Sequence, residues 1–179
     1  MSRPPAAPAR GATRERLLDA YEELICDQGP RAATLDAVAS TAGVSKGGLL
    51  YHYGSKDALV EGQLARLRRL AGADLDLMRA APEGAAAYYL NTSVDDLVPG
   101  LHRATVAAVR LAQDGEARAV TVFGEITEDW RAAIEEQVGD RRLSRVIQLI
   151  GDGMWLNATM GVPAEDAQEL LASLRALGI

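Results

Sequence analysis

The sequence has little of several residue types on which other classes of protein depend. Its 179 residues include one cysteine, Cys26, which excludes an internal disulfide and a metal cage built from several thiolates. We expect Cys26 to be a small buried side chain, because free cysteines are commonly buried. Only 4% of the residues are aromatic, so the core must be built mainly from Leu, Val, Ile and Ala. No apolar run approaches the roughly 18 residues that a membrane span requires, so we expect no membrane partner.

The first residues, 1–12, also lack the apolar stretch of a signal peptide. They are rich in proline, alanine and arginine but have no apolar central stretch, so they do not resemble a signal peptide. We expect them to form a flexible arm on a soluble, cytoplasmic protein.

Charge is unevenly distributed along the chain. The net charge of −6 is unusual for a protein that binds a polyanion. Residues 1–70, however, carry ten Lys or Arg against eight Asp or Glu, whereas residues 71–179 carry nine against seventeen. This asymmetry favours contact with nucleic acid through the first part of the chain, with an acidic body turned away from it.

Apolar residues recur at intervals of three and four along almost the whole sequence, and no useful period of two is present. This pattern predicts an all-α fold of about nine helices. Thr13, Thr34, Ser45 and Ser55 are expected to cap helix starts, and Pro82 is expected in the first turn of another. The expected helices are 13–28, 34–41, 45–53, 55–80, one from residue 82, one from 101, one ending at 139, 143–160 and 167–177.

The segment Thr34–Leu59 carries the most specific chemistry. Two short helices joined by a corner that contains Gly43 are typical of a helix-turn-helix. Leu49 and Tyr53 give the second helix one buried stripe. Two adjacent glycines at 47–48 cost roughly 1 kcal/mol each in a helix, which indicates that a bulky partner such as a DNA groove comes close to the backbone.

The same segment resembles the DNA-binding domain of the tetracycline-repressor (TetR) family. The resemblance rests on Thr34–Ala39, Ala42–Gly47, Leu49, Tyr51–Tyr53, Ser55–Lys56 and Leu59. One residue departs from the pattern, because Leu50 stands where the family most often has a tyrosine that touches a phosphate. Leucine cannot donate that hydrogen bond, so we expect Tyr51 and His52 to anchor more of the DNA backbone.

The resemblance implies three functional segments: an arm at 1–12, a three-helix helix-turn-helix DNA-binding domain at 13–58, and a helical effector-binding and dimerisation domain at 59–179. Lysine side chains and the free N–H groups at a helix start suit phosphate. The predicted DNA contacts are Thr34, Ser45, Lys46, Gly47, Gly48, Leu50, Tyr51, His52 and Lys56.

A single helix-turn-helix reads few base pairs, so a specific reader of this type pairs across a two-fold axis and binds a palindromic operator. The last two apolar stripes favour a homodimer, and Gly151 and Gly153 would let two backbones approach. The predicted interface residues are Ile147, Ile150, Gly151, Met154, Leu170, Leu171 and Leu174.

The larger side chains gather in the middle of the sequence. A cluster of this kind is as typical of plain core as of a binding site. The resemblance implies that these side chains enclose a small-molecule effector. The long helix at 55–80 would then transmit effector binding to the DNA-binding domain and weaken DNA binding. The predicted pocket residues are Met78, Tyr88, Tyr89, His102, Phe123, Trp130 and Trp155.

The sequence disfavours catalysis. Its two histidines and one cysteine lie far apart and supply no nucleophile–base pair, and His102 has no cluster of metal ligands around it. We therefore expect no catalytic residue, metal or cofactor. The favoured function is a repressor released by a small molecule. A helical adaptor that has lost specific DNA binding is the alternative, and a small helical enzyme is disfavoured.

Overall fold

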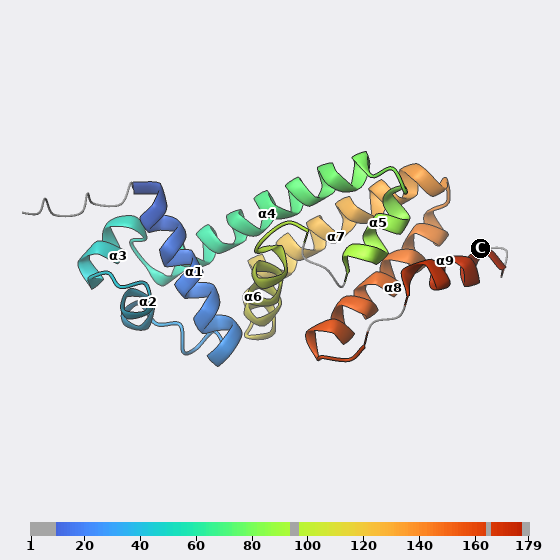
Figure 1. Ribbon diagram of the computed structural model, residues 1–179. Coiled ribbons are helices and arrows are strands. Elements are labelled where there is room, and N and C mark those ends of the chain that lie inside the picture. Colours follow the sequence, from blue (N-terminus) through green and yellow to red (C-terminus); the bar gives the residue numbers. More distant parts are fainter. Residues whose placement is uncertain (1–9, 94–96, 164–165, 177–179) are drawn as a thin grey trace, which may run out of the picture. The chain divides into compact units, whose positions relative to one another are not determined.

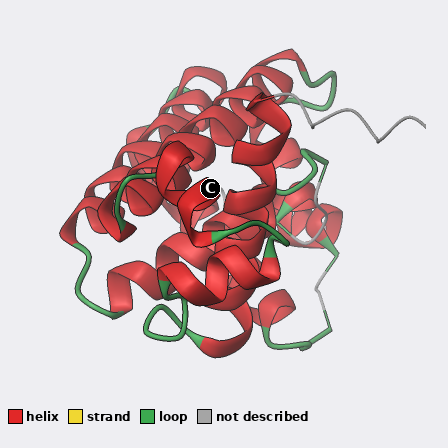
Figure 2. Ribbon diagram, turned by 90° about the vertical axis from the view of Figure 1, so that its left-hand side faces the viewer, coloured by secondary structure: helices red, strands yellow, loops and turns green. Residues whose placement is uncertain are grey.

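The computed structural model describes residues 10–93, 97–163 and 166–176, and every regular element in these ranges is a helix (Figures 1 and 2). This confirms the all-α prediction. None of the helices in the described ranges is long and apolar enough to cross a membrane. The described residues contain nine helices: α1 (Arg10–Gln28), α2 (Leu35–Thr41), α3 (Lys46–His52), α4 (Lys56–Ala80), α5 (Ala85–Thr92), α6 (Leu101–Gln113), α7 (Ala117–Val138), α8 (Arg141–Thr159) and α9 (Ala167–Ala176).

The helices form two compact units. Unit 1 contains the described residues up to Leu67 together with Arg103–Val120, and unit 2 contains Arg68–His102 and the described residues from Thr121 onward. As packed units, α6 therefore groups with the first helices. The functional division expected at residues 58 and 59 stays a prediction.

Unit 1 is built around α1, which packs against α2 and α3. The side chains of Leu17 and Tyr21 of α1 and Leu49 of α3 are fully buried. The α6 helix is attached by polar contacts as well as apolar ones: the Gln63 amide of α4 donates to the Ala104 carbonyl at 3.4 Å, and the Arg110 guanidinium donates to the Ile25 carbonyl at 3.4 Å. The Ile25 carbonyl also accepts from the Gly29 N–H at 3.0 Å, so the Arg110 bond is an additional link between α6 and the end of α1.

Two predicted helix starts are wrong. Thr13 lies inside α1, which already begins at Arg10. Pro82 lies in a turn before α5, because Gly84 adopts a φ of +88° directly before the helix. Glycine has no side chain with which to cap α5, and the Gln137 amide oxygen of α7 accepts from the Ala86 N–H at 2.9 Å instead.

In unit 2, α5 packs against α8 and α9. The approach of α5 to α8 depends on Gly151, since a Cβ added there would lie 2.5 Å from Cε1 of Tyr89. The Tyr89 hydroxyl then reaches past Gly151 and donates to the Asp152 carboxylate at 2.7 Å. Burial raises the pKa of this hydroxyl well above its usual value, and the Asp152 charge adds to the shift.

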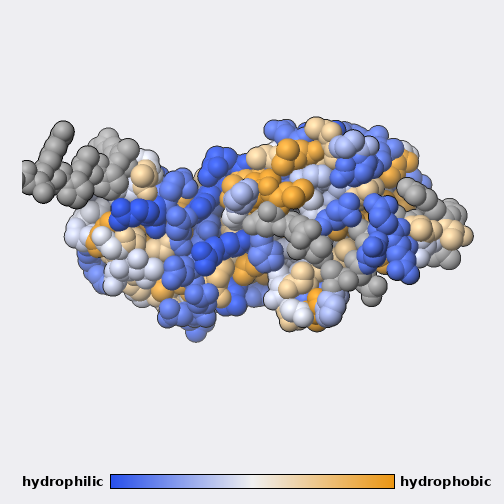
Figure 3. All heavy atoms as spheres, in the orientation of Figure 1, coloured by the Kyte–Doolittle hydropathy of each residue, from blue (hydrophilic) through white to orange (hydrophobic). Residues whose placement is uncertain are grey.

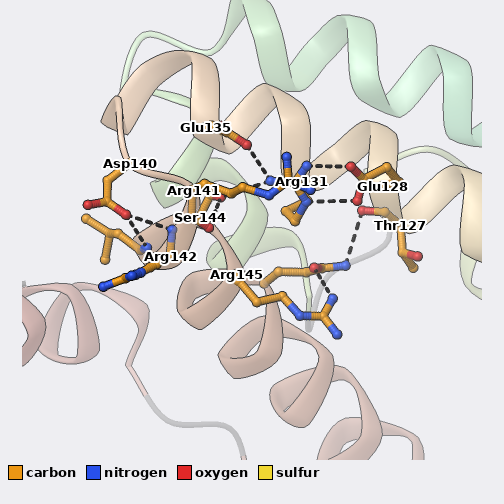
Figure 4. A network of polar contacts seen from close by, with 11 residues as sticks. Thr127, Glu128, Arg131, Glu135, Asp140, Arg141, Arg142, Ser144 and Arg145 are labelled. Carbon is orange, nitrogen blue, oxygen red and sulfur yellow. Dashed lines mark hydrogen bonds and ion pairs between the residues drawn. The ribbon is translucent and has the colours of Figure 1, made fainter.

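A buried arginine joins α7 to α8 (Figure 4). The Arg131 guanidinium lies between the carboxylates of Glu128 and Glu135 on its own helix and donates to the Ser144 hydroxyl of α8 at 3.3 Å. Asp140, in the short connection, caps α8 by accepting from two backbone N–H groups at 2.7 and 3.0 Å. The turn between the two helices is therefore held by charge-assisted hydrogen bonds.

Candidate nucleic-acid interface

The helix-turn-helix begins with a capped α2. The Thr34 hydroxyl accepts from the Ala37 N–H at 3.2 Å, which confirms the predicted cap, and Val38 and Ala39 are buried. Gly43 in the corner has a φ of +65°, a conformation that residues with a Cβ rarely adopt. Glycine at this position therefore permits the sharp change of direction toward α3.

The second helix, α3, is capped in the same way. The Ser45 hydroxyl accepts from the Gly48 N–H at 3.1 Å, and Leu49 and Tyr53 are buried as their spacing predicts. Burial raises the pKa of the Tyr53 hydroxyl above its usual value, and the Arg14 charge partly offsets this shift. The two buried residues fix which faces of α3 are left for solvent.

Two arginines of α1 hold the ends of the helix-turn-helix. The Arg14 guanidinium donates to the His52 carbonyl at 3.0 Å and lies 4.4 Å from the centre of the Tyr53 ring. Arg16 donates to the Ala42 carbonyl at 2.8 Å. A cation at a helix C-terminus also complements the helix dipole. Sequence reasoning missed both residues, because no local pattern links α1 to carbonyls 26 and 38 positions away.

The two predicted phosphate-binding lysines already have partners within unit 1. Lys46 Nζ lies 3.0 Å from the Asp36 carboxylate, and both side chains are mostly exposed. Lys56 Nζ donates to the Pro30 carbonyl at 2.8 Å. An exposed pair of this kind contributes little stability and exchanges readily, so Lys46 is free to move to a phosphate while Asp36 stays as a nearby repulsive charge.

The face of α3 turned away from the core is accessible. Tyr51 is 65% exposed and Leu50 is 40% exposed, a large exposure for two bulky residues on one short helix. A Cβ added at Gly47 would meet no atom within 4 Å among the described residues, so none of them requires glycine there. On the side seen in Figure 3, strongly hydrophilic residues are interspersed with apolar ones over α1–α3.

The structure places the predicted DNA-contact residues together in unit 1 (Figure 1). Thr34, Ser45, Lys46, Gly47 and Lys56 are exposed, whereas Gly48 and His52 are half-buried. The His52 ring meets the Tyr51 ring edge to face, with centroids 5.2 Å apart. The arrangement is a short, capped helix that presents an aromatic hydroxyl, an apolar side chain and a bare backbone to a partner, as a major-groove reader requires.

Comparison with known proteins agrees with this geometry. Residues 17–62 match the family model described as bacterial regulatory proteins, tetR family, and residues 83–178 match the tetracyclin repressor-like C-terminal domain. The chain belongs to the TetR family. The family is one of bacterial regulatory proteins, and the chain spans about half or less of the length of the first two curated relatives that it matches.

Three relatives define the extent of the similarity. The chain is 40% identical to the uncharacterized regulator TtgW of Pseudomonas putida over 65 residues, which are 36% of this chain and 48% of TtgW. It is 27% identical to the regulator BetI of Rhizobium meliloti over 168 residues, 92% of this chain and 73% of BetI. The solved structure of the multidrug binding protein EbrR complexed with malachite green shares the fold, with a TM-score of 0.68, 21% identity, and coverage of 90% of this chain and 96% of EbrR.

The predicted effector-pocket residues of this TetR-family chain are scattered. Met78, Tyr88, Tyr89 and Trp130 are buried, whereas His102 is exposed. Contacts join them in pairs: the rings of Tyr89 and Trp130 are 6.0 Å apart, and those of His102 and Trp155 are 5.7 Å apart. Phe123 and Trp155 are half-buried. Their role in binding an effector stays a prediction.

The predicted dimer residues on α8 differ in exposure, and their role stays a prediction. Ile147, Gly151 and Met154 are buried within the single chain. Ile150, Leu170 and Leu174 are half-buried, and the side chain of Leu171 lies outside the described residues. An exposed apolar stripe lies on a neighbouring face and contains Val146, Leu149, Gly153 and Leu156 of α8 and its C-cap Met160, named here the α8 stripe.

Proposed function

We propose that the protein is a homodimeric repressor that binds a palindromic operator through α3 and leaves it when a small molecule binds. The single observation that carries the DNA-binding half of this proposal is the exposed face of α3, with Tyr51 and the bare backbone of Gly47, in a unit whose helix-turn-helix is fully capped.

The α8 stripe supports the dimer. Its residues recur at steps of three and four, which is the spacing of a helix that packs against another helix. Leu149 is 53% exposed, Leu156 is 51% exposed and Met160 is 62% exposed. Large side chains exposed in a row on one helix indicate an interaction surface. No described residue has an atom within 4 Å of a Cβ built on Gly153, so a second helix has room to come close at that point.

Sedimentation of the full chain tests the dimer. Leu149→Arg puts a charge in the α8 stripe and is expected to shift the protein from twice its 19.0 kDa mass toward one copy. Leu77→Arg is the matched control, because Leu77 is a similarly exposed leucine of α4 outside the stripe, at 47%. A dimer that survives Leu149→Arg unchanged contradicts the assignment.

A mobility shift tests the repressor. Labelled DNA that flanks the protein's own gene is incubated with the full chain at two salt concentrations. We expect a shift that is specific for an inverted repeat and weakens as salt rises, because phosphate contacts release counterions. A ligand that favours a conformation unable to bind DNA lowers the affinity of the protein for the operator. By linkage, the operator lowers the affinity for that ligand by the same factor.

One observation favours the alternative function, an adaptor without specific DNA binding. Leu50 occupies an exposed position on α3 and cannot donate a hydrogen bond to phosphate. The same mobility shift separates the two functions, since an adaptor gives no salt-dependent, repeat-specific complex.

A further inference from the structure

A cavity of about 170 Å³ lies between α4 and α7 within unit 2. Its walls include the apolar side chains of Leu75 and Ile126 and the indole of Trp130. Among the residues predicted from sequence as effector contacts, Trp130 lines this cavity. The size is informative, since a cavity of about 150 Å³ holds one benzene ring and drug-sized ligands need about 300 Å³ or more.

The charged groups of the cavity are unbalanced. Arg68 Nη2 lies 2.6 Å from the Glu125 carboxylate, so these two charges neutralise each other. Asp129, one helical turn after Glu125, also lines the cavity and has neither an ion pair nor a hydrogen bond within the described part of the chain. The lining therefore carries one negative charge that no cation of the described chain balances.

Trp130 adds a second reason to expect a cation. Its side chain is 9% exposed, and its ring is held in place by a tilted contact with Tyr89. Tryptophan has the aromatic face that attracts cations most strongly.

We propose that this cavity binds a small organic cation, a single ring that carries one ammonium group. The ammonium group pairs with the Asp129 carboxylate, and the ring lies against Leu75, Ile126 and Trp130. An anion of the same size is repelled by the unpaired Asp129 carboxylate, and a neutral molecule lacks the charge attraction to Asp129. As an effector site the cavity rests on the ligand-released regulation proposed above, but as a binding site it does not.

Calorimetric titration of the full chain without DNA tests the binding site. The probes are benzylammonium, benzyl alcohol and benzoate, which share one ring and differ in charge. We expect benzylammonium to bind at least about tenfold more tightly than benzyl alcohol, and benzoate not to bind. A tenfold ratio is the effect of one modest charge interaction. Equal binding of all three probes, or no binding of benzylammonium at millimolar concentration, overturns the proposal.

Two variants locate the site. Asp129→Asn changes an exposed side chain, so the fold is retained, and it is expected to weaken benzylammonium about tenfold while leaving benzyl alcohol unchanged. Asp76→Asn removes the same charge from an exposed position of α4 outside the cavity and serves as the control. Equal losses in the two variants overturn the assignment of Asp129.

DNA binding is measured separately. Release of the operator by benzylammonium in the wild-type chain, and not in Asp129→Asn, supports the cavity as the effector site. Calorimetric binding with no release supports the cation site and contradicts its regulatory role. A failure of the regulatory proposal is thus distinguishable from a failure of the binding site.

Discussion

Gly47 provides the sharpest test of how α3 meets DNA. Gly47 is the second residue of α3 and is exposed, and within residues 10–93, 97–163 and 166–176 no atom lies within 4 Å of the position that a Cβ would take. Gly47→Ala is therefore expected to raise the free energy of unfolding by about 0.5 kcal/mol, because alanine is the better helix residue. If the DNA backbone or bases occupy that space in the complex, the same methyl group must overlap with them.

The expected loss of DNA affinity follows from the cost of overpacking. Inserting a methyl group into a filled contact costs about 1–3 kcal/mol, which corresponds to a loss of about 5- to 150-fold in affinity. Fluorescence anisotropy with an operator fragment measures the affinity, and thermal unfolding measures stability. The two quantities should move in opposite directions, which simple damage to the fold cannot produce.

Gly124→Ala is the matched control. Gly124 is an exposed residue inside α7 with nothing within 4 Å of its added Cβ. This variant should gain about 1 kcal/mol of stability and bind the operator as the wild type does. Wild-type DNA affinity in a stable Gly47→Ala protein would refute the reasoning that the glycine admits DNA.

Three further predictions concern other parts of the molecule. Gly151→Ala should destabilise the protein by about 1–3 kcal/mol in chemical unfolding, because its Cβ would lie 2.5 Å from Cε1 of Tyr89; a stability equal to that of Gly124→Ala would contradict this packing. Asp140→Ala should lower the unfolding temperature at pH 7, since two backbone N–H groups hold the pKa of Asp140 below its usual value of 3.8. That stabilisation is present above the unfolded-state pKa and is lost as the pH falls through the lowered one, so the two melting curves should converge in acid, and a constant difference down to about pH 2 would count against the cap. Tyr51→Phe should weaken operator binding about tenfold, the effect of losing one hydrogen bond to a phosphate, and unaltered affinity would exclude that contact.

The helix-turn-helix could be predicted from the sequence because its determinants are local. Thr34 and Ser45 cap helices through atoms three residues away, and the burial of Leu49 and Tyr53 follows from their spacing of four. Contacts of this range depend on helix geometry alone. They fix the face of α3 that remains exposed.

The face of α8 could not be predicted in the same way. Its sequence has apolar residues on two sides, and both sides suit a partner. Which side is buried depends on α5, more than fifty positions earlier, where the Tyr89 ring fills the space beside Gly151. The predicted face, with Ile147 and Met154, was therefore the one that α8 turns to its own chain.

Contacts of charged side chains between helices could not be predicted from the sequence either. The contact of Arg131 with Ser144 of α8 and the Asp36–Lys46 pair are set by packing between helices, whereas Glu128 and Glu135 lie one turn from Arg131 on its own helix. The unbalanced charge of Asp129 in the cavity of unit 2 belongs to the same class, because its surroundings come from α4. Side-chain electrostatics of this kind appears only when the fold is known.

Selection of DNA from a random double-stranded library by the full-length chain tests the central claim most directly. If two copies of α3 read DNA across a two-fold axis, successive rounds should enrich an inverted repeat whose half-sites are about one helical turn apart. Gly47→Ala should enrich it weakly or not at all. A library that stays unenriched after selection by the wild-type protein would contradict the account.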